Sequence, residues 1–287
     1  DSSPGNSADL TPSRARDASD SSATSREASK STGREASTSK DDARRESKRE
    51  SRRDRLTALD VTLHELLGKG SYGMVYRAST TRLGLGDVAV KVLPWAPNEV
   101  SSELKKELKL LQRCDSPYIV RAHGSFPKPK ELWIVIEYCD LGSVLDTMRS
   151  IGQPLDEGAI AQVCRDALCG LLHLHTQKRV VIHRDVKAAN ILLTSAATVK
   201  LADFGVAAQL NSTASKRSSV IGTPHWMAPE VISNGKYDAR ADVWSLGVTC
   251  YELLTGAPPH NEMGSAMAVM YRIVNGPPPP PPPECTA

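Results

Sequence analysis

The chain has 287 residues, of which 40% are hydrophobic, and its 36 basic residues against 33 acidic ones give a net charge of +3, which is no reason to expect a nucleic-acid partner. No stretch approaches the roughly 20 apolar residues of a membrane helix, and no apolar run resembles a secretory signal, so we expect a cytoplasmic protein without a membrane span. The six cysteines are scattered, with no Cys-x-x-Cys pair and no histidine at zinc-finger spacing, which argues against a disulfide framework or a structural metal site.

The N-terminal residues 1–57 are rich in Ser, Thr and charges of both signs, and Leu10 is the single large aliphatic residue before residue 56. Burial cannot offset the entropy of ordering such a segment, so we expect a disordered tail. Its arginine-dense part, residues 44–55, favours a solvated linker, with weak contact to an anionic surface as the alternative. Because the first residue is Asp rather than Met, we expect a fragment or a trimmed product.

The first motif is a glycine pattern, G-x-G-x-x-G, which dinucleotide-binding folds also use. In those folds a helix begins at the third glycine, whereas here residues 74–78 alternate as in a strand, which predicts a hairpin. Small residues in such a hairpin allow backbone N–H groups to close over phosphates. The candidate phosphate contacts are Gly68, Lys69, Gly70, Ser71, Tyr72 and Gly73, and an ordinary glycine turn is the alternative.

A lysine, Lys91, lies near the end of the next apolar run. A charge in such surroundings needs a compensating partner. Residues 102–114 predict a helix, and Glu107 falls on the same face as its leucines. Glu107 is therefore the favoured counter-ion. Glu103 is one alternative, and a fully solvated helix acid is the other.

The remaining apolar runs predict an α+β fold. Residues 88–93 and 132–138 have strand character, whereas residues 156–175 have helical spacing behind an Asp that can cap the helix. The apolar helix positions are Ile160, Val163, Ala167, Leu171 and Leu174. Strands precede helices, which indicates a small antiparallel sheet lobe over residues 58–140 and a larger helical lobe over residues 141–276.

Three further motifs follow in order. The segment His183-Arg184-Asp185-Val186-Lys187-Ala188-Ala189-Asn190 comes after an apolar run, Asp203-Phe204-Gly205 after a strand-like run, and Ala228-Pro229-Glu230 after Gly222-Thr223-Pro224. With the glycine pattern and Lys91, this set resembles the protein kinases from about residue 59 to residue 276. The resemblance implies a bilobal kinase fold, ATP and Mg²⁺ as cofactors, and protein substrates.

Phosphoryl transfer requires positioning and cations more than covalent chemistry. Asp203 and Asn190 offer the hard oxygen atoms that Mg²⁺ prefers, and Asp185 can accept and orient the proton of a substrate hydroxyl. The resemblance assigns catalytic roles to Lys91, Glu107, Asp185, Lys187 and Thr223. Lys187 and the segment that contains Thr223 imply serine or threonine acceptors rather than tyrosine.

The resemblance also implies an adenine pocket. Its apolar walls are Val75, Ala89 and Leu192, its rear gate is Ile136, and its hinge is Glu137, Tyr138 and Cys139. For the apolar positions a structural interpretation and a functional one coincide, because a pocket wall is also part of the core. Asp242 resembles the buried acid that holds the catalytic loop.

A polar segment rich in hydroxyl residues lies between Asp203 and Glu230. Arg184, next to the catalytic aspartate, is a cation that needs an anion. We expect phosphorylation of Ser219, or as the second choice Ser218, to supply that anion and to order the segment.

Within the kinases, residues 114–120, 132–139, 200–207 and 220–230 most resemble the sterile-twenty-like serine/threonine kinases of the Hippo-type, germinal-centre class. That resemblance implies signalling enzymes that phosphorylate other kinases and autophosphorylate their activation loop. It also implies further C-terminal helices, with an arginine that pairs with Glu230, so we expect the helical lobe to be C-terminally incomplete.

The chain ends in a proline-rich tail, residues 277–287, with seven consecutive prolines from Pro277 to Pro283. Such a run predicts an extended polyproline helix, so we expect folded structure to stop there. The run could instead dock into aromatic-lined proline-reading modules of partner proteins. Two alternatives to an active kinase therefore remain, an inactive nucleotide-binding scaffold and a proline-rich interaction protein. The complete set of Lys91, Glu107, Asp185, Asn190 and Asp203 favours the active kinase.

Overall fold

The computed structural model describes residues 60–70, 73–81, 84–94, 108, 111–203, 223–233 and 237–282. All of them belong to the second of two units into which the chain divides, residues 55–287. None of the helices in this described part combines the length and apolarity that crossing a bilayer requires.

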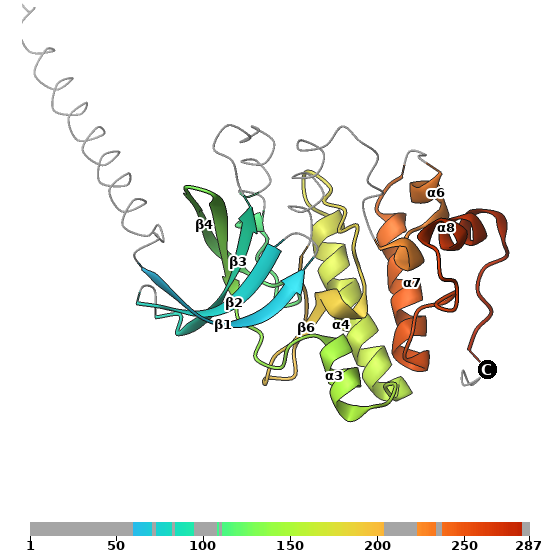
Figure 1. Ribbon diagram of the computed structural model, residues 1–287, viewed down its shortest axis with the longest axis horizontal. Helices are drawn as coiled ribbons and strands as arrows, with labels where there is room; N and C mark the ends of the chain where they lie inside the picture. Colours follow the sequence, from blue (N-terminus) through green and yellow to red (C-terminus); the bar gives the residue numbers. More distant parts are fainter. Residues whose placement is uncertain are drawn as a thin grey trace, which may run out of the picture. The chain divides into compact units, whose positions relative to one another are not determined.

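A five-stranded antiparallel sheet comes first along the chain (Figure 1). Its strands are β1 (Val61–Gly70), β2 (Gly73–Thr80), β3 (Asp87–Pro94), β4 (Ala122–Lys128) and β5 (Glu131–Glu137). They lie in the order β1-β2-β3-β5-β4, so β3 is the central strand. The strands expected at residues 88–93 and 132–138 are confirmed as β3 and β5.

Both faces of β3 are buried, because its residues alternate between two apolar surfaces. One surface is a core cluster of Val61, Ala78, Val88, Val90, Val92, Phe126, Trp133 and Val135. On the other, Val75 pairs with Lys91 across β2 and β3, and Ala89 pairs with Ile136 across β3 and β5. The register therefore places Lys91 on the same face as three of the predicted pocket residues.

Helices make up most of the chain beyond the sheet. They are α3 (Val144–Ile151), α4 (Glu157–His175), α6 (Pro229–Ile232), α7 (Arg240–Thr255) and α8 (Ala266–Asn275), with short 3-10 turns η2 (Ala188–Asn190) and η3 (Pro224–Trp226). A small hairpin, β6 (Ile191–Leu193) and β7 (Val199–Leu201), lies among them. An α+β architecture of a sheet followed by helices is thus confirmed.

The long helix α4 confirms the sequence pattern in detail. Asp156 caps it by accepting a hydrogen bond from the Ala159 backbone N–H at 2.9 Å, and all five predicted apolar positions are buried. Ile160, Val163, Ala167 and Leu171 share a core with Leu246 and Leu253 of α7 and with Ile191 and Leu201 of the small hairpin, whereas Leu174 packs with Cys114, Ile119 and Val181. The helices α4 and α7 therefore pack together and support the loop that lies between β6 and α4 (Figure 1).

Candidate active site

The loop that contains Asp185 is anchored by one buried carboxylate. Asp242, in the first turn of α7 and fully buried, accepts hydrogen bonds from the backbone N–H groups of His183 and Arg184, each at 2.8 Å. His175, at the end of α4, contacts the same carboxylate at 2.7 Å through Nε2. Arg184 has a positive φ of 71°, a conformation that such anchoring can hold. The sequence indicated Asp242 but gave no signal for His175.

A second carboxylate of α7 fixes the same loop further along. Glu252 Oε2 accepts hydrogen bonds from the Ala188 backbone N–H and from the Trp226 indole N–H, both at 3.1 Å. The Glu252 side chain is buried, and this burial raises the pKa of its carboxyl group above 4.5, against the opposing effect of the two hydrogen bonds. Glu252 therefore joins the loop that contains Asp185 to η3, and no local sequence pattern indicated it because its partners lie 26 and 64 residues away.

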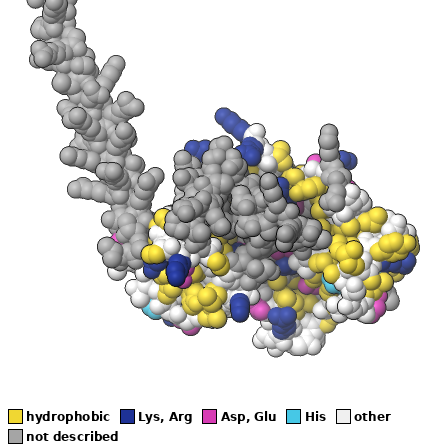
Figure 2. Space-filling model, turned by 45° about the horizontal axis from the view of Figure 1, so that its top comes forward, with side chains coloured by type: hydrophobic (Ala, Val, Ile, Leu, Met, Phe, Trp, Pro, Cys, Tyr) yellow, Lys and Arg dark blue, Asp and Glu magenta, His cyan; other side chains and the backbone are white. Residues whose placement is uncertain are grey.

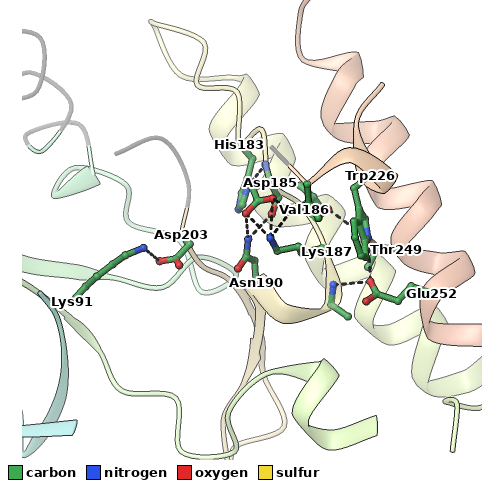
Figure 3. A network of polar contacts seen from close by, with 12 residues as sticks. Lys91, His183, Asp185, Val186, Lys187, Asn190, Asp203, Trp226, Thr249 and Glu252 are labelled. Atoms are coloured by element: carbon green, nitrogen blue, oxygen red, sulfur yellow. Dashed lines mark hydrogen bonds and ion pairs between the residues drawn. The ribbon is translucent and has the colours of Figure 1, made fainter. Parts of the chain in front are cut away.

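Three other predicted site residues contact Asp185, and Figure 3 labels two of them, Lys187 and Asn190. Lys187 Nζ lies 3.0 and 2.9 Å from the two carboxylate oxygens of Asp185, and also donates to the Thr223 hydroxyl at 2.7 Å. Thr223 in turn donates to Asp185 Oδ1 at 3.0 Å. Asn190 Nδ2 donates to the backbone oxygen and to Oδ2 of Asp185, at 2.7 and 2.8 Å. The Asp185 carboxylate is thus oriented from three sides.

A separate ion pair joins the sheet to the small hairpin. Lys91 Nζ lies 2.7 Å from Asp203 Oδ1, and the Lys91 side chain is only 10% exposed (Figure 3). Asp203 follows β7 with a positive φ of 63°, and the preceding Ala202 N–H donates to the Asn190 backbone oxygen at 2.9 Å. This backbone hydrogen bond holds Asp203 close to Asn190 in space, although the two residues are 13 positions apart in the sequence.

The glycine pattern lies in the β1–β2 hairpin, as predicted, and not at the start of a helix. Gly68, Lys69 and Gly70 end β1, and Gly70 pairs with Gly73 at the start of β2. A Cβ atom on Gly73 would collide with the Val92 backbone oxygen, so only glycine fits where β2 approaches β3. At Gly68, in contrast, a Cβ atom would meet open space.

The predicted adenine-pocket residues lie on neighbouring elements. Ile136 and Leu192 pack against a small core cluster that contains Cys139. Glu137 is held by Lys200 of β7, with 3.1 Å between Oε1 and Nζ, and accepts a hydrogen bond from the Arg121 backbone N–H. Burial, aided by the Glu137 carboxylate, raises the pKa of the Cys139 thiol to about 12, so this thiol stays protonated.

Several predicted residues lie outside the described part of the chain. They are Ser71, Tyr72, Glu107, Ser218 and Ser219. In the helix expected at residues 102–114, the described Leu108 and Leu111 pack against the sheet. Arg184 is exposed, and its guanidinium lies 5.8 Å from the centre of the Tyr237 ring. Among the described residues it has no acidic partner within ion-pair distance.

Comparison with known proteins places this arrangement in a family. Residues 61–276 match the family described as the protein kinase domain. The chain is 49% identical over 203 residues to serine/threonine-protein kinase hippo of Drosophila melanogaster, an alignment that covers 71% of the chain and 30% of that relative. It is 49% identical over 208 residues to serine/threonine-protein kinase 1 of Arabidopsis thaliana, covering 72% of the chain and 24% of the relative.

A third relative, serine/threonine-protein kinase cst-1 of Caenorhabditis elegans, is 48% identical over 203 residues, with 71% of the chain and 40% of the relative covered. The chain therefore spans less than half the length of these curated relatives. The similarity to hippo agrees with the branch that the motifs indicate. Because the family match extends over most of the chain, the chain belongs to the protein kinase family.

Proposed function

We propose that this chain is a serine/threonine protein kinase that transfers the γ-phosphate of ATP to hydroxyl groups of protein substrates. The observation that carries the proposal is the Asp185 carboxylate, which is contacted by Lys187, Thr223 and Asn190 at 2.8 to 3.0 Å. Such an oriented carboxylate can bind a substrate hydroxyl at the position where proton transfer is needed. The family match implies the use of ATP, and the similar proteins are named serine/threonine kinases.

In the proposed reaction the substrate hydroxyl oxygen forms a bond to the γ-phosphorus while the bond from this phosphorus to the β–γ bridging oxygen breaks. Asp185 orients the hydroxyl and accepts its proton. Lys187, 2.9 Å from Asp185 Oδ2, can neutralise the transferred group, and Lys91 can bind the inner phosphates. Backbone N–H groups of the β1–β2 hairpin would cover the phosphates, and the hinge residues would pair with adenine.

The donor atoms near this site fit Mg²⁺. Asn190 directs both hydrogens of its amide at Asp185, so its Oδ1 atom is the end available to a cation. Asp203 adds a carboxylate, and no cluster of three or more His, Cys, Asp or Glu residues capable of holding a metal occurs among the described residues. One carboxylate and one amide suit an ion that keeps waters and binds substrate phosphates. When bound, Mg²⁺ would neutralise phosphate charge.

The proposed activation uses Arg184. This exposed side chain, stacked near Tyr237, has no acidic partner among the residues that the structure describes, whereas a phosphate on Ser219 would offer several acceptor oxygens. We propose Ser219, with Ser218 as the alternative, as the activating site, and other protein kinases as the substrate class. In Ser219→Ala we expect activity after phosphorylating treatment to stay at its untreated level; full activation of this variant would reject Ser219.

The function is tested by Asp185→Asn with Mg²⁺, ATP and a generic basic protein substrate. Phosphate transfer should fall at least a thousandfold, since typical kinases turn over at roughly 1–100 per second and such a loss remains measurable, while a fluorescent ATP analogue should bind nearly unchanged. Asp115→Asn is the matched control, because that side chain is 77% exposed and its Arg121 partner lies 3.7 Å away. Equal turnover in both variants would refute the role of Asp185, and no turnover in the unmodified chain would favour a nucleotide-binding scaffold.

A further inference from the structure

One apolar cavity lies outside the phosphate-transfer site. It has a volume of about 430 Å³ and lies, partly open to solvent, between α7 and the proline run. The α7 side contributes Trp244, Gly247, Tyr251 and Leu254, which share one face of the helix because they are spaced by three or four residues. The opposite side consists of Pro278 to Pro282. Figure 2 shows hydrophobic side chains gathered over the end of the molecule that holds α8 and this run.

The proline run has one inward edge. Pro279 is half-buried and Pro282 is buried, whereas Pro277, Pro278, Pro280 and Pro281 are exposed. A polyproline helix has three residues per turn, so every third proline lies on the same edge. The burial pattern therefore follows the period of that helix, as expected for a run that lies against a surface and not for one surrounded by solvent.

The distance between the two inward prolines is also close to the distance between two aromatic residues of α7. Pro279 and Pro282 are one polyproline turn apart, about 9 Å along its axis. Trp244 and Tyr251 are two turns apart on α7, about 10.5 Å along its axis. Two aromatic rings of α7 thus recur at nearly the same distance as the two inward prolines.

The hydrogen-bonding groups are complementary as well. The Trp244 indole nitrogen is buried and has no hydrogen-bond partner in the described structure. An indole N–H can only donate. Proline residues have no N–H, and a polyproline helix has no internal hydrogen bonds, so the run offers carbonyl oxygens and nothing else. A buried donor therefore lines the same cavity as a row of free acceptors.

We propose that the proline run binds in cis to this groove of α7, with Pro279 and Pro282 packed toward Trp244 and Tyr251, and that a small inward shift of the run lets the Trp244 indole N–H, which is unpaired in the described structure, donate to a proline carbonyl. Aromatic grooves recognise polyproline helices in this manner because the ligand is already extended and loses little entropy. A proline-reading module of another protein would then have to displace the run before binding it. This contact does not involve the residues proposed for phosphate transfer.

The test compares two double variants of the full chain. Pro279→Ser/Pro282→Ser, the inward variant, alters the two least exposed prolines, and Pro277→Ser/Pro280→Ser alters two exposed prolines with the same spacing and the same loss of prolines; of these, Pro277 does not line the cavity. The readout is the Trp244 indole resonance in a ¹H–¹⁵N spectrum and its hydrogen-exchange rate. We expect the inward variant alone to shift the resonance and to speed exchange about tenfold, the change expected when one hydrogen bond opens. Equal responses of both variants, or none, would overturn the proposal.

A second measurement uses peptide binding in place of hydrogen exchange. Free decaproline is added to the unmodified chain and to the inward variant, whose groove has lost its own ligand. The peptide should move the Trp244 resonance of the inward variant back toward its original position and leave the unmodified chain unaffected. A response of the same size in both proteins, or in neither, would show that the groove does not bind this run.

Discussion

Among the residues that anchor the loop containing Asp185, the buried Asp242 of α7 should be the most sensitive to substitution. In Asp242→Asn the side chain keeps its shape, but one of its two acceptor atoms becomes an NH₂ group. With the amide oxygen at the Oδ2 position, the contacts to His183 N–H and His175 can remain, and the new NH₂ faces the Arg184 N–H, 2.8 Å away in the unmodified protein. At least one buried donor is then left without an acceptor.

The size of the effect follows from these contacts. A buried donor without a partner costs about 1–3 kcal/mol, and hydrogen bonds to a charged acceptor exceed neutral ones by about 1 kcal/mol each. The loss of one partner and of two charge-assisted bonds therefore lowers the free energy of unfolding by about 3–5 kcal/mol. For a domain of this size, that corresponds to a decrease in Tm of about 10 °C.

Thermal and urea unfolding followed by circular dichroism measure this change. Asp238→Asn is the control, because Asp238 lies just before α7, is 57% exposed and pairs with Arg240 at the surface. We expect the control to unfold at the temperature of the unmodified chain. If the free energy of unfolding of Asp242→Asn falls by less than about 1 kcal/mol, the three hydrogen bonds to Asp242 do not stabilise the loop.

Three further predictions concern Gly73, Thr223 and Glu252. Gly73→Ala should lower the free energy of unfolding by about 2 kcal/mol or more, because its Cβ atom would collide with the β3 backbone, while Gly68→Ala should change it little in the same urea titration; similar effects of both would contradict this. Thr223→Val should reduce kinase turnover about 10- to 100-fold through loss of the hydroxyl that contacts Asp185, with Thr223→Ser close to the unmodified rate. Since burial raises the folded-state pKa of Glu252 above 4.5, the folded chain binds more protons than the unfolded chain above that pH and loses stability as pH rises through the folded pKa. Glu252→Gln has no carboxyl group at this position, so its stability should not show this decrease. The difference in free energy of unfolding between the unmodified chain and Glu252→Gln should therefore narrow with rising pH in urea titrations; a constant difference would exclude the effect.

Local patterns were sufficient to predict several of the regular elements. The alternation in residues 88–93 and 132–138 appears as β3 and β5, and the capped apolar spacing of residues 156–175 appears as α4. Each of these signals depends on residues within a few positions of one another, where the periods of strand and helix act directly. For the same reason the β-type residues after the third glycine predicted a hairpin correctly.

The partners of the charged site residues could not be predicted in this way. The motif identified Lys91, but the described structure pairs it with Asp203, 112 positions later in the chain, whereas the favoured partner, Glu107, lies outside the described residues. His175 contacts an acid 67 positions away. Periodicity indicates which face of an element is buried, and it contains no information on which distant group will satisfy a charge on that face.

The polar residues of α7 do not form a solvent-exposed face. Its polar residues Asp242, Ser245, Thr249 and Glu252 are all buried, and each binds the catalytic loop or the η3 region. Trp244, Gly247, Tyr251 and Leu254 form the face toward the proline run. The second set is the first displaced by about two residues, which corresponds to about 200° around a helix. Polar and apolar stripes therefore lie on opposite sides of α7 and both contact protein, so polarity does not mark a solvent-exposed face here. Because both stripes belong to one rigid helix, the position of α7 sets the geometry of the catalytic loop and of the proline-binding groove together.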